Sequence, residues 1–164
     1  MSTAATQTQT ATFSLGCFWG AEHLLQKHYP PSENNGILKT TVGYTGGHLE
    51  NPDYDSVGTG KTGHAESVKI EFDPSVVSYD ELVGKATASE LAKYRSSIFT
   101  HSDEQRAIAQ RVTEEVQAKH FTPKDQRIVT EILPASEWYD AEEYHQRYSF
   151  KNPDYSCPAH RLFW

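Results

Sequence analysis

Residues 11–29 have the sequence Ala-Thr-Phe-Ser-Leu-Gly-Cys-Phe-Trp-Gly-Ala-Glu-His-Leu-Leu-Gln-Lys-His-Tyr. Within this stretch the pattern of side chains changes from one that favours a strand to one that favours a helix. Its first part, Ala11–Leu15, is short and contains Thr and Phe, which favour strands. Its second part, Cys17–Tyr29, carries Trp, Leu and His side chains at positions that can share one side of a helix. The stretch therefore predicts a strand that runs into Gly16 and a helix that begins at Cys17.

The rest of the chain continues this alternation. A half-buried strand is predicted at Ala65–Phe72, because apolar and polar side chains alternate there. Ser78 and Ser102 each begin a capping-box pattern, which predicts a helix after each of them. We also expect strands at 37–42 and 127–133, a helix at 139–150, and loops at 43–47 and 48–63. Strands and helices interleaved in this way, with no repeat, predict a two-layer α/β or α+β domain.

The composition excludes several classes of protein. The chain has 164 residues, 37% of them hydrophobic, with 15 basic and 22 acidic side chains and a net charge of −7. This balance, without a dense run of Lys or Arg, argues against nucleic-acid binding. The longest apolar run, Leu15–Ala21, has seven residues when the glycines are counted, whereas a membrane-spanning helix needs about 20. We therefore expect one domain, and neither nucleic acid nor a membrane as partner.

The cysteines and the start of the chain indicate the compartment. Cys17 and Cys157 are the two cysteines, too few for the disulfide-rich scaffold of a small secreted protein. Residues 1–11 carry no charged side chain and so lack the basic region of a signal peptide. We expect these residues to be a disordered leader and residues 12–164 to be a single domain. The features predict a cytoplasmic protein, in which a disulfide would be transient and part of the chemistry.

A glycine pattern in the middle of the chain imitates a nucleotide-binding motif. Gly58, Gly60 and Gly63 satisfy G-x-G-x-x-G, but the dinucleotide motif follows a strand and opens a helix. Here the pattern comes just before the strand predicted at Ala65–Phe72. Nucleotide binding is therefore not expected.

Cys17 is the candidate nucleophile. At the N-terminus of a helix, unpaired N–H groups and the helix dipole favour the thiolate, which is the reactive form. Gly16 and Gly20 leave the backbone open around the sulfur. The alternative is a buried cysteine that acts as a small hydrophobic residue. Phe18 and Trp19 could form an apolar wall for a ligand or part of the core, and their spacing does not separate the two.

Several short motifs make the chain resemble a known enzyme family. It is similar to the A-type peptide methionine sulfoxide reductases, in the family's order and from about residue 12 to the C-terminus. The motifs that carry the resemblance are Gly-Cys-Phe-Trp-Gly-Ala-Glu at 16–22, Gly-Tyr-Thr-Gly-Gly at 43–47, Thr-Gly-His-Ala-Glu at 62–66, Tyr-Arg-Ser at 94–96, Ala-Glu-Glu-Tyr-His-Gln at 141–146 and Lys-Asn-Pro at 151–153. The resemblance implies an α+β fold, with a two-layer ferredoxin-like core, additional helices and an irregular C-terminal tail. It also implies thiol-dependent reduction of methionine (S)-S-oxide, free or in proteins, a repair reaction in the response to oxidative stress.

The resemblance further implies roles in the reaction. Cys17 would attack the sulfoxide sulfur, and Glu66 would protonate the leaving oxygen. Such an acid must be neutral near pH 7, and a poorly hydrated aromatic pocket raises a carboxyl pKa in that direction. The other site residues would bind the substrate: its S-methyl group by Phe18 and Trp19, and its sulfoxide oxygen by hydrogen bonds from Tyr44 and Tyr94. Without the motifs, Glu66 would be interpreted as an exposed carboxylate at a strand end and the tyrosines as packing residues.

Cys157 is implied as the resolving cysteine. The attack leaves Cys17 as a sulfenic acid, which condenses with a second thiol to an intramolecular disulfide. An external dithiol, by family analogy thioredoxin, would reduce the pair. The alternatives are an idle cysteine in a turn-rich tail and, with His160, half of a zinc site, for which no second Cys/His pair lies at suitable spacing. We expect a monomer without a cofactor or metal.

One segment departs from the family pattern. The family has a longer stretch, with an active-site aspartate, where this chain has only residues 84–93, and Ser89 stands where that aspartate would be. A non-catalytic or unstable isoform of the family is therefore one alternative to the reductase. Another is a generic thiol enzyme such as a cysteine hydrolase, in which His64 or His145 would act as the base for Cys17.

Overall fold

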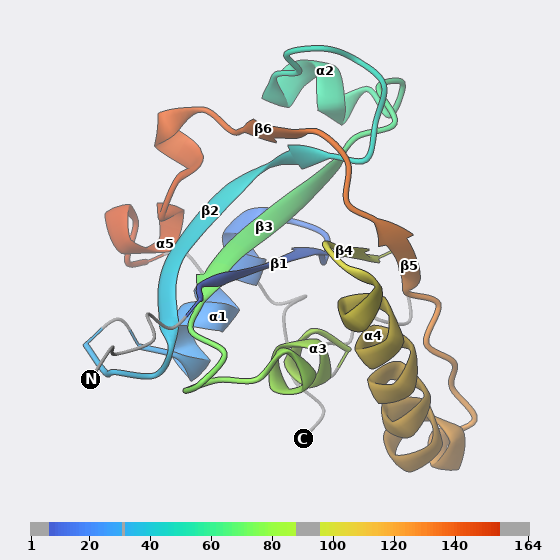
Figure 1. Cartoon of the computed structure of the whole chain (residues 1–164). Helices are drawn as coiled ribbons and strands as arrows, with labels where there is room; N and C mark the ends of the chain where they lie inside the picture. The colour runs from blue at the N-terminus through green and yellow to red at the C-terminus, as the bar shows by residue number, and fades with distance from the viewer. Residues whose placement is uncertain (1–6, 31, 88–95, 155–164) are drawn as a thin grey trace.

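The structure is a computed structural model that describes residues 7–30, 32–87 and 96–154 (Figure 1). Its strands and helices, in chain order, are β1 (Gln9–Ser14), α1 (Phe18–His28), β2 (Ile37–Thr45), α2 (Tyr54–Gly58), β3 (Ala65–Phe72), α3 (Tyr79–Thr87), β4 (Ser97–Thr100), α4 (Asp103–Val116), β5 (Glu131–Pro134), β6 (Trp138–Asp140) and α5 (Tyr148–Lys151). The strands form one sheet in the order β5-β4-β1-β3-β2-β6. Neighbouring strands are antiparallel except β4 and β5, which are parallel. The fold is therefore mixed α/β.

The core lies between the sheet and two helices. Phe13 of β1 pairs with Val68 of β3, and Ala11 with Ile70, so these four buried side chains share one face of the sheet. Side chains of α1 and α3 line the same hollow as Phe13 and Ile70, so both helices cover that face. Each fully buried side chain of this size stabilises the fold by about 1.5–3 kcal/mol. The alternation predicted for Ala65–Phe72 is confirmed from Val68 to Phe72, whereas Ser67 is buried as well.

The two predicted helix starts are confirmed. Ser78 Oγ accepts a hydrogen bond from the backbone N–H of Glu81 at 3.1 Å, and Ser102 Oγ accepts one from Gln105 at 3.1 Å. The Gln105 side chain does not complete a capping box. Its Oε1 accepts from the N–H of His101 and its amide donates to the carbonyl of Thr10, which ties the start of α4 to β1.

Glycine content misled the sequence prediction at the end of β2. Residues 43–47 were expected to form a loop, but β2 continues to Thr45. A Cβ on Gly43 would lie 2.4 Å from the carbonyl oxygen of Tyr139 and 2.5 Å from the Trp138 ring. Glycine is needed here because β6 approaches closely, not because the chain turns.

Three further boundaries differ from the predictions. The expected loop 48–63 contains α2, which begins with a capping box between Asp53 and Ser56. Residues 9–11, assigned to the leader, belong to β1, where they pair with β3. The strand predicted at 127–133 is shorter and lies at Glu131–Pro134.

The helix predicted at 139–150 is wrong. This segment contains the end of β6, a 3-10 turn at Glu143–His145 and the four-residue helix α5. Its polar side chains bond to distant parts of the chain instead of lying on a solvated helix face: Gln146 Oε1 accepts from the N–H of Val42 at 2.9 Å, and its amide donates to the Val42 carbonyl at 2.8 Å. We call residues 141–147 the strap, because they bind the outer side of β2 and the start of α1. Figure 1 shows this part of the chain and α5 beside β2.

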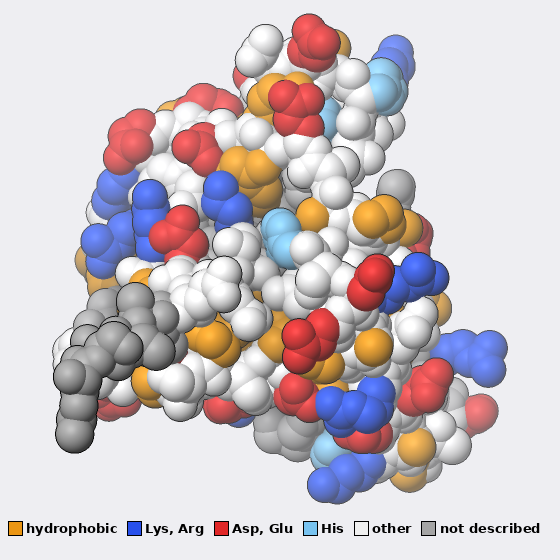
Figure 2. Space-filling model, in the orientation of Figure 1, with side chains coloured by type: hydrophobic (Ala, Val, Ile, Leu, Met, Phe, Trp, Pro, Cys, Tyr) orange, Lys and Arg blue, Asp and Glu red, His pale blue; other side chains and the backbone are white. Residues whose placement is uncertain are grey.

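The surface mixes both charges. Figure 2 shows acidic and basic side chains interspersed over the face that it draws, in keeping with the net charge of −7. In the described ranges, none of the helices is long and apolar enough to cross a membrane.

Candidate active site

Cys17 lies at the predicted junction. β1 ends at Ser14, Gly16 adopts φ +78°, and Cys17 is the N-cap of α1. The left-handed backbone at Gly16 favours glycine, since a Cβ would be strained there. The carbonyl of Cys17 accepts the first helical hydrogen bond, from the N–H of Ala21 at 3.1 Å. The Cys17 side chain is partly exposed and lines a cleft of about 500 Å3 together with Glu66.

Glu66 comes to the same cleft from the sheet. It lies on β3 directly opposite Tyr44 of β2 and is half-buried. Burial raises the pKa of Glu66 above its usual value of 4.5, and a hydrogen bond from the backbone N–H of Phe18 opposes that rise. This carboxyl group therefore keeps its proton to a higher pH than an exposed glutamate does. Because Phe18 follows Cys17, the N–H that contacts the carboxyl belongs to the residue next to the thiol.

Aromatic side chains pack against one another next to Cys17, and we call this cluster around Phe18, Trp19 and His145 the aromatic wall. Phe18 is buried, with its ring centroid 5.8 Å from that of Tyr44 and 5.1 Å from that of His145. Trp19 is partly exposed and stacks on Tyr148, with centroids 3.8 Å apart and planes at 6°. Phe18 thus belongs to the core, and neither Phe18 nor Trp19 is among the residues that line the cleft of Cys17 and Glu66.

Tyr44 is fully buried, and its hydroxyl donates to Oε1 of Glu142 at 3.1 Å. Burial, followed by the charge of Glu142 and this hydrogen bond, raises the pKa of Tyr44 far above its usual value. The phenol is therefore neutral and has one proton to donate. In this structure that proton goes to Glu142, so a sulfoxide oxygen would have to compete with a carboxylate for it.

His145 occupies the centre of the aromatic wall. Its side chain is 1% exposed, its Nδ1 accepts a hydrogen bond from Nε1 of Trp19 at 2.9 Å, and its Nε2 lies 3.4 Å from Oε2 of Glu142. Burial lowers the pKa of His145, against the opposing effect of Glu142. The ring is therefore neutral near pH 7, and because Nδ1 is an acceptor, Nε2 carries the proton.

Neither histidine named as a base for Cys17 is available for that role. His64 Nδ1 accepts from the N–H of Gly47 at 3.0 Å, and its Nε2 lies 2.7 Å from the carbonyl of Leu49, to which it donates. The nitrogens of His145 face Trp19 and Glu142. These contacts argue against the cysteine-hydrolase alternative, which needs an imidazole acceptor at the thiol.

Glu22 anchors the strap to α1. It is 1% exposed, and its two oxygens accept from the hydroxyl of Thr40 and from the N–H of Arg147, each at 2.7 Å. Burial raises the pKa of Glu22 despite these hydrogen bonds. Removing this carboxyl group would take away the acceptor of the Thr40 hydroxyl and of the Arg147 N–H, and one such hydrogen bond contributes about 0.5–1.5 kcal/mol.

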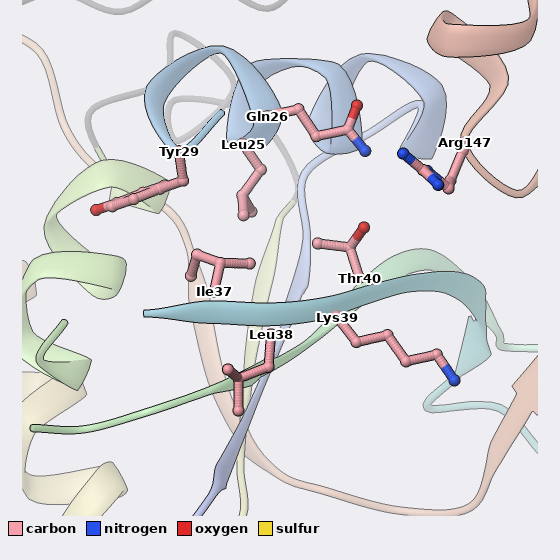
Figure 3. Close-up of a pocket in the computed structure, with 8 residues that line it drawn as sticks. All are labelled: Leu25, Gln26, Tyr29, Ile37, Leu38, Lys39, Thr40 and Arg147. Atoms are coloured by element: carbon pink, nitrogen blue, oxygen red, sulfur yellow. The ribbon is translucent and has the colours of Figure 1, made fainter. Parts of the chain in front are cut away.

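A second hollow, of about 340 Å3, lies at the other end of α1 (Figure 3). The figure shows Leu25 of α1 and Ile37 of β2 pointing toward each other across it. Two of its polar groups, the Thr40 hydroxyl and the Arg147 N–H, already bind Glu22. The hollow belongs to the packing of α1 on β2, and its lining residues include no cysteine.

Sequence reasoning missed two residues of the site, Tyr54 and Glu142, and named a third, His145, only as a possible base for Cys17. The ring of Tyr54 lies 4.8 Å from that of His145, and the charges of Glu66 and Cys17 add to the burial that raises the Tyr54 pKa. No pattern could have found it, since it stands in a segment expected to be a loop. Glu142 and His145 are in the quoted motif at 141–146, but the helix expected there gave them no partners.

Two of the predicted site residues, Tyr94 and Cys157, lie outside the described residues, as do Ser89 and His160. The other five are described: Cys17, Phe18, Trp19, Tyr44 and Glu66. Of these, Cys17 and Glu66 line the cleft itself. Within 7–30, 32–87 and 96–154, no three His, Cys, Asp or Glu side chains are grouped so as to hold a metal ion.

Comparison with known proteins shows similarity to one enzyme family. The family model for peptide methionine sulfoxide reductase matches residues 9–162. A probable peptide methionine sulfoxide reductase of Schizosaccharomyces pombe is 46% identical over an alignment of 169 residues. The alignment covers 95% of this chain and 97% of that protein. Peptide methionine sulfoxide reductase MsrA of Methanothermobacter thermautotrophicus is 44% identical, covering 94% of each chain.

Solved structures are similar over nearly the whole chain. The crystal structure of reduced Mxr1 from Saccharomyces cerevisiae superposes with a TM-score of 0.83 at 34% identity, covering 95% of this chain and 92% of that one. The structure of Mxr1 in complex with Trx2 superposes with a TM-score of 0.66 at 29% identity, covering 99% and 94%. The cleft with Cys17 and Glu66 thus lies in a fold that these proteins share.

Proposed function

The chain belongs to the peptide methionine sulfoxide reductase family, and from that premise we propose that it reduces methionine (S)-S-oxide, free or in proteins, to methionine. The thiolate of Cys17 attacks the sulfoxide sulfur, and Glu66 gives its proton to the oxygen. The new Sγ–S bond then breaks as the protonated oxygen passes from the methionine sulfur to Sγ, so methionine leaves as the thioether and Cys17 becomes a sulfenic acid. The observation that supports this most strongly is the shared cleft, in which a carboxyl with raised pKa accepts from the N–H next to the nucleophile.

The aromatic wall suits the apolar end of the substrate. Phe18 and Trp19 would hold the S-methyl group, and Tyr44 would donate to the sulfoxide oxygen once that oxygen displaces Glu142. Tyr94 is proposed as a second donor from the family motif alone. The sulfoxide sulfur is chiral, because it carries an oxygen, a methyl group and the side-chain methylene. A site that binds the oxygen and the methyl group at separate fixed places accepts one epimer, which is the reason to expect one.

Regeneration would use a second thiol and an external dithiol. Cys157 would attack the sulfenic acid, release water and form a disulfide with Cys17. A thioredoxin-type protein would then reduce that disulfide, a step for which the structure of the relative Mxr1 with Trx2 offers support.

We also propose the organisation expected from the sequence: one domain, now counted from Gln9, acting as a cytoplasmic monomer. The succession β1-α1-β2-β3-α3-β4 and the strand order β4-β1-β3-β2 support a ferredoxin-like core to which β5 and β6 add at the edges. In the described residues, Cys17 and Glu66 line the same cleft, so nothing there favours the alternative of an inactive isoform.

A single-turnover experiment tests the proposal. Reduced protein is mixed with methionine S-sulfoxide, and the methionine formed and thiols remaining are counted. One methionine per chain with loss of both thiols is expected, and Cys17→Ser should form none. Loss of only one thiol would remove Cys157 from the scheme. No methionine from folded wild-type protein would refute the function.

A further inference from the structure

We propose that Glu142 and His145 are positioning residues that join Trp19 to Tyr44 through one chain of polar contacts, in which the carboxylate fixes the tautomer of the imidazole. Trp19 belongs to α1, Tyr44 to β2, and the two joining residues to the strap. The catalytic consequence rests on the proposed function, because Trp19 and Tyr44 are the residues proposed to hold the substrate. The tautomer itself does not rest on it.

The first step of the argument is the acceptor at Nδ1. The indole of Trp19 can only donate, and its Nε1 lies 2.9 Å from Nδ1 of His145. A neutral imidazole has one donor and one acceptor nitrogen. Nε2 must therefore be the N–H, and it faces Oε2 of Glu142 at 3.4 Å. This contact does not have the geometry of a hydrogen bond: among the described residues, the buried Nε2 has no hydrogen-bond partner.

The second step is that this series of polar contacts needs two acceptor oxygens on residue 142. Oε1 accepts from the Tyr44 hydroxyl at 3.1 Å, while Oε2 faces the N–H of His145. A carboxylate presents two acceptor oxygens, whereas a glutamine amide presents one oxygen and one NH2. An NH2 facing Nε2 would favour the tautomer with the proton on Nδ1, and that proton would point at the N–H of Trp19.

The third step is that the strap is held independently of the site. Gln146 bonds to both backbone groups of Val42, and Arg147 donates to Glu22 of α1. Glu142 and His145 therefore have a fixed position relative to both elements they join. The charge of the carboxylate that faces Nε2 favours a proton on that nitrogen, and the low dielectric of a buried site strengthens this effect.

The test begins with the wild-type protein. Nitrogen-15 NMR of the reduced protein near pH 7 should show His145 as the neutral Nε2–H tautomer. A proton on Nδ1, or a charged ring, would overturn the proposal whatever the enzyme activity is. Absence of turnover in wild-type protein would instead refute the proposed function and leave the tautomer measurement valid.

The variants Glu142→Gln and Glu143→Gln form a matched pair. Glu143 is the exposed neighbour, with a side chain 92% accessible and a 3.8 Å contact to Lys151. Glu142→Gln should shift the His145 tautomer, move the Trp19 indole N–H resonance and change KM for methionine sulfoxide by up to roughly tenfold, the factor typical of one altered hydrogen bond. Glu143→Gln should leave all three unchanged.

Glu142→Asp keeps two carboxylate oxygens and should retain the Nε2–H tautomer. It also keeps the test informative if Glu142→Gln does not fold, as circular dichroism would report. Unchanged tautomer and KM in folded Glu142→Gln would show that the carboxylate does not position the pair, and would overturn the proposal.

Discussion

Tyr44 and Glu66 are direct partners in the antiparallel register of β2 and β3, so their side chains project from the same face of the sheet. The charge of Glu66 is one of the causes that raise the pKa of Tyr44, so the two groups interact electrostatically. A shift of this register by one residue would place the two side chains on opposite faces of the sheet. The sheet thus positions the proposed acid and one proposed oxygen donor together, while α1 brings the thiol.

Glu66→Gln should lower kcat by about 10²–10⁴-fold, the usual contribution of a general acid, with a much smaller change in KM. The amide has the same size and cannot supply the proton. Steady-state kinetics with methionine S-sulfoxide measures both constants. Glu71→Gln is the control, because Glu71 lies on the same strand, five residues away and on the other face. Equal losses in both variants would contradict the assignment.

The pH dependence should follow the protonation of Glu66. Its pKa is raised by burial, and the acid form is the active one. Activity is therefore present below that raised pKa and falls as the pH rises through it. A profile of kcat/KM against pH should show this falling limb in wild-type protein and lack it in Glu66→Gln. The same limb in both proteins would assign it to another group.

Glu22 should make stability depend on pH. Its folded-state pKa is raised above the usual 4.5, so between these two values the folded protein binds more protons than the unfolded one, and the free energy of unfolding falls as the pH rises. Relative to Glu22→Gln, wild-type protein should lose stability across that window. Urea denaturation over a pH series gives the slope, and the constant cost of the altered hydrogen bonds cancels. A rising difference would contradict the direction.

Gly43→Ala should destabilise the protein by about 1–3 kcal/mol, the usual cost of overpacking. The added Cβ would meet Trp138 and the Tyr139 carbonyl at 2.4–2.5 Å, so β6 would have to move away from β2. Urea denaturation measures the loss.

Gly84→Ala is the opposite case. Gly84 lies inside α3, and a Cβ there meets nothing within 4 Å. Alanine should stabilise the helix by about 0.5–1 kcal/mol, because it loses less backbone freedom on folding. A loss of stability in the same denaturation experiment would show that the helix face around Gly84 is packed more tightly than its open space indicates.

Local patterns predicted the elements whose causes are local. The alternation in Ala65–Phe72 and the serine caps before α3 and α4 act within a few residues, and the structure has them where the patterns put them. The strand that leads into Gly16 and the helix that starts at Cys17 belong to the same class. The motifs then identified Cys17 and Glu66, which do line one cleft.

The strap could not be predicted in this way. Its conformation depends on Gln146 bonding to Val42, 104 residues away, and on Arg147 bonding to Glu22, 125 residues away. Helical propensity favours the stretch, and these tertiary hydrogen bonds override it. For the same reason the roles of Glu142 and His145 become visible only in three dimensions.

The hydrogen bond from Tyr44 to Glu142 has a consequence for the turnover cycle. Under the proposed reaction, the carboxylate occupies at rest the bond that the sulfoxide oxygen takes during catalysis. Methionine, the product, offers only a thioether sulfur, which is a weak acceptor. The carboxylate of Glu142 therefore accepts the hydrogen bond from the Tyr44 hydroxyl again when the oxygen has left. The pocket thus contains an internal competitor for the Tyr44 hydroxyl, which the substrate oxygen must displace and which accepts that hydrogen bond again once the oxygen has passed to Cys17.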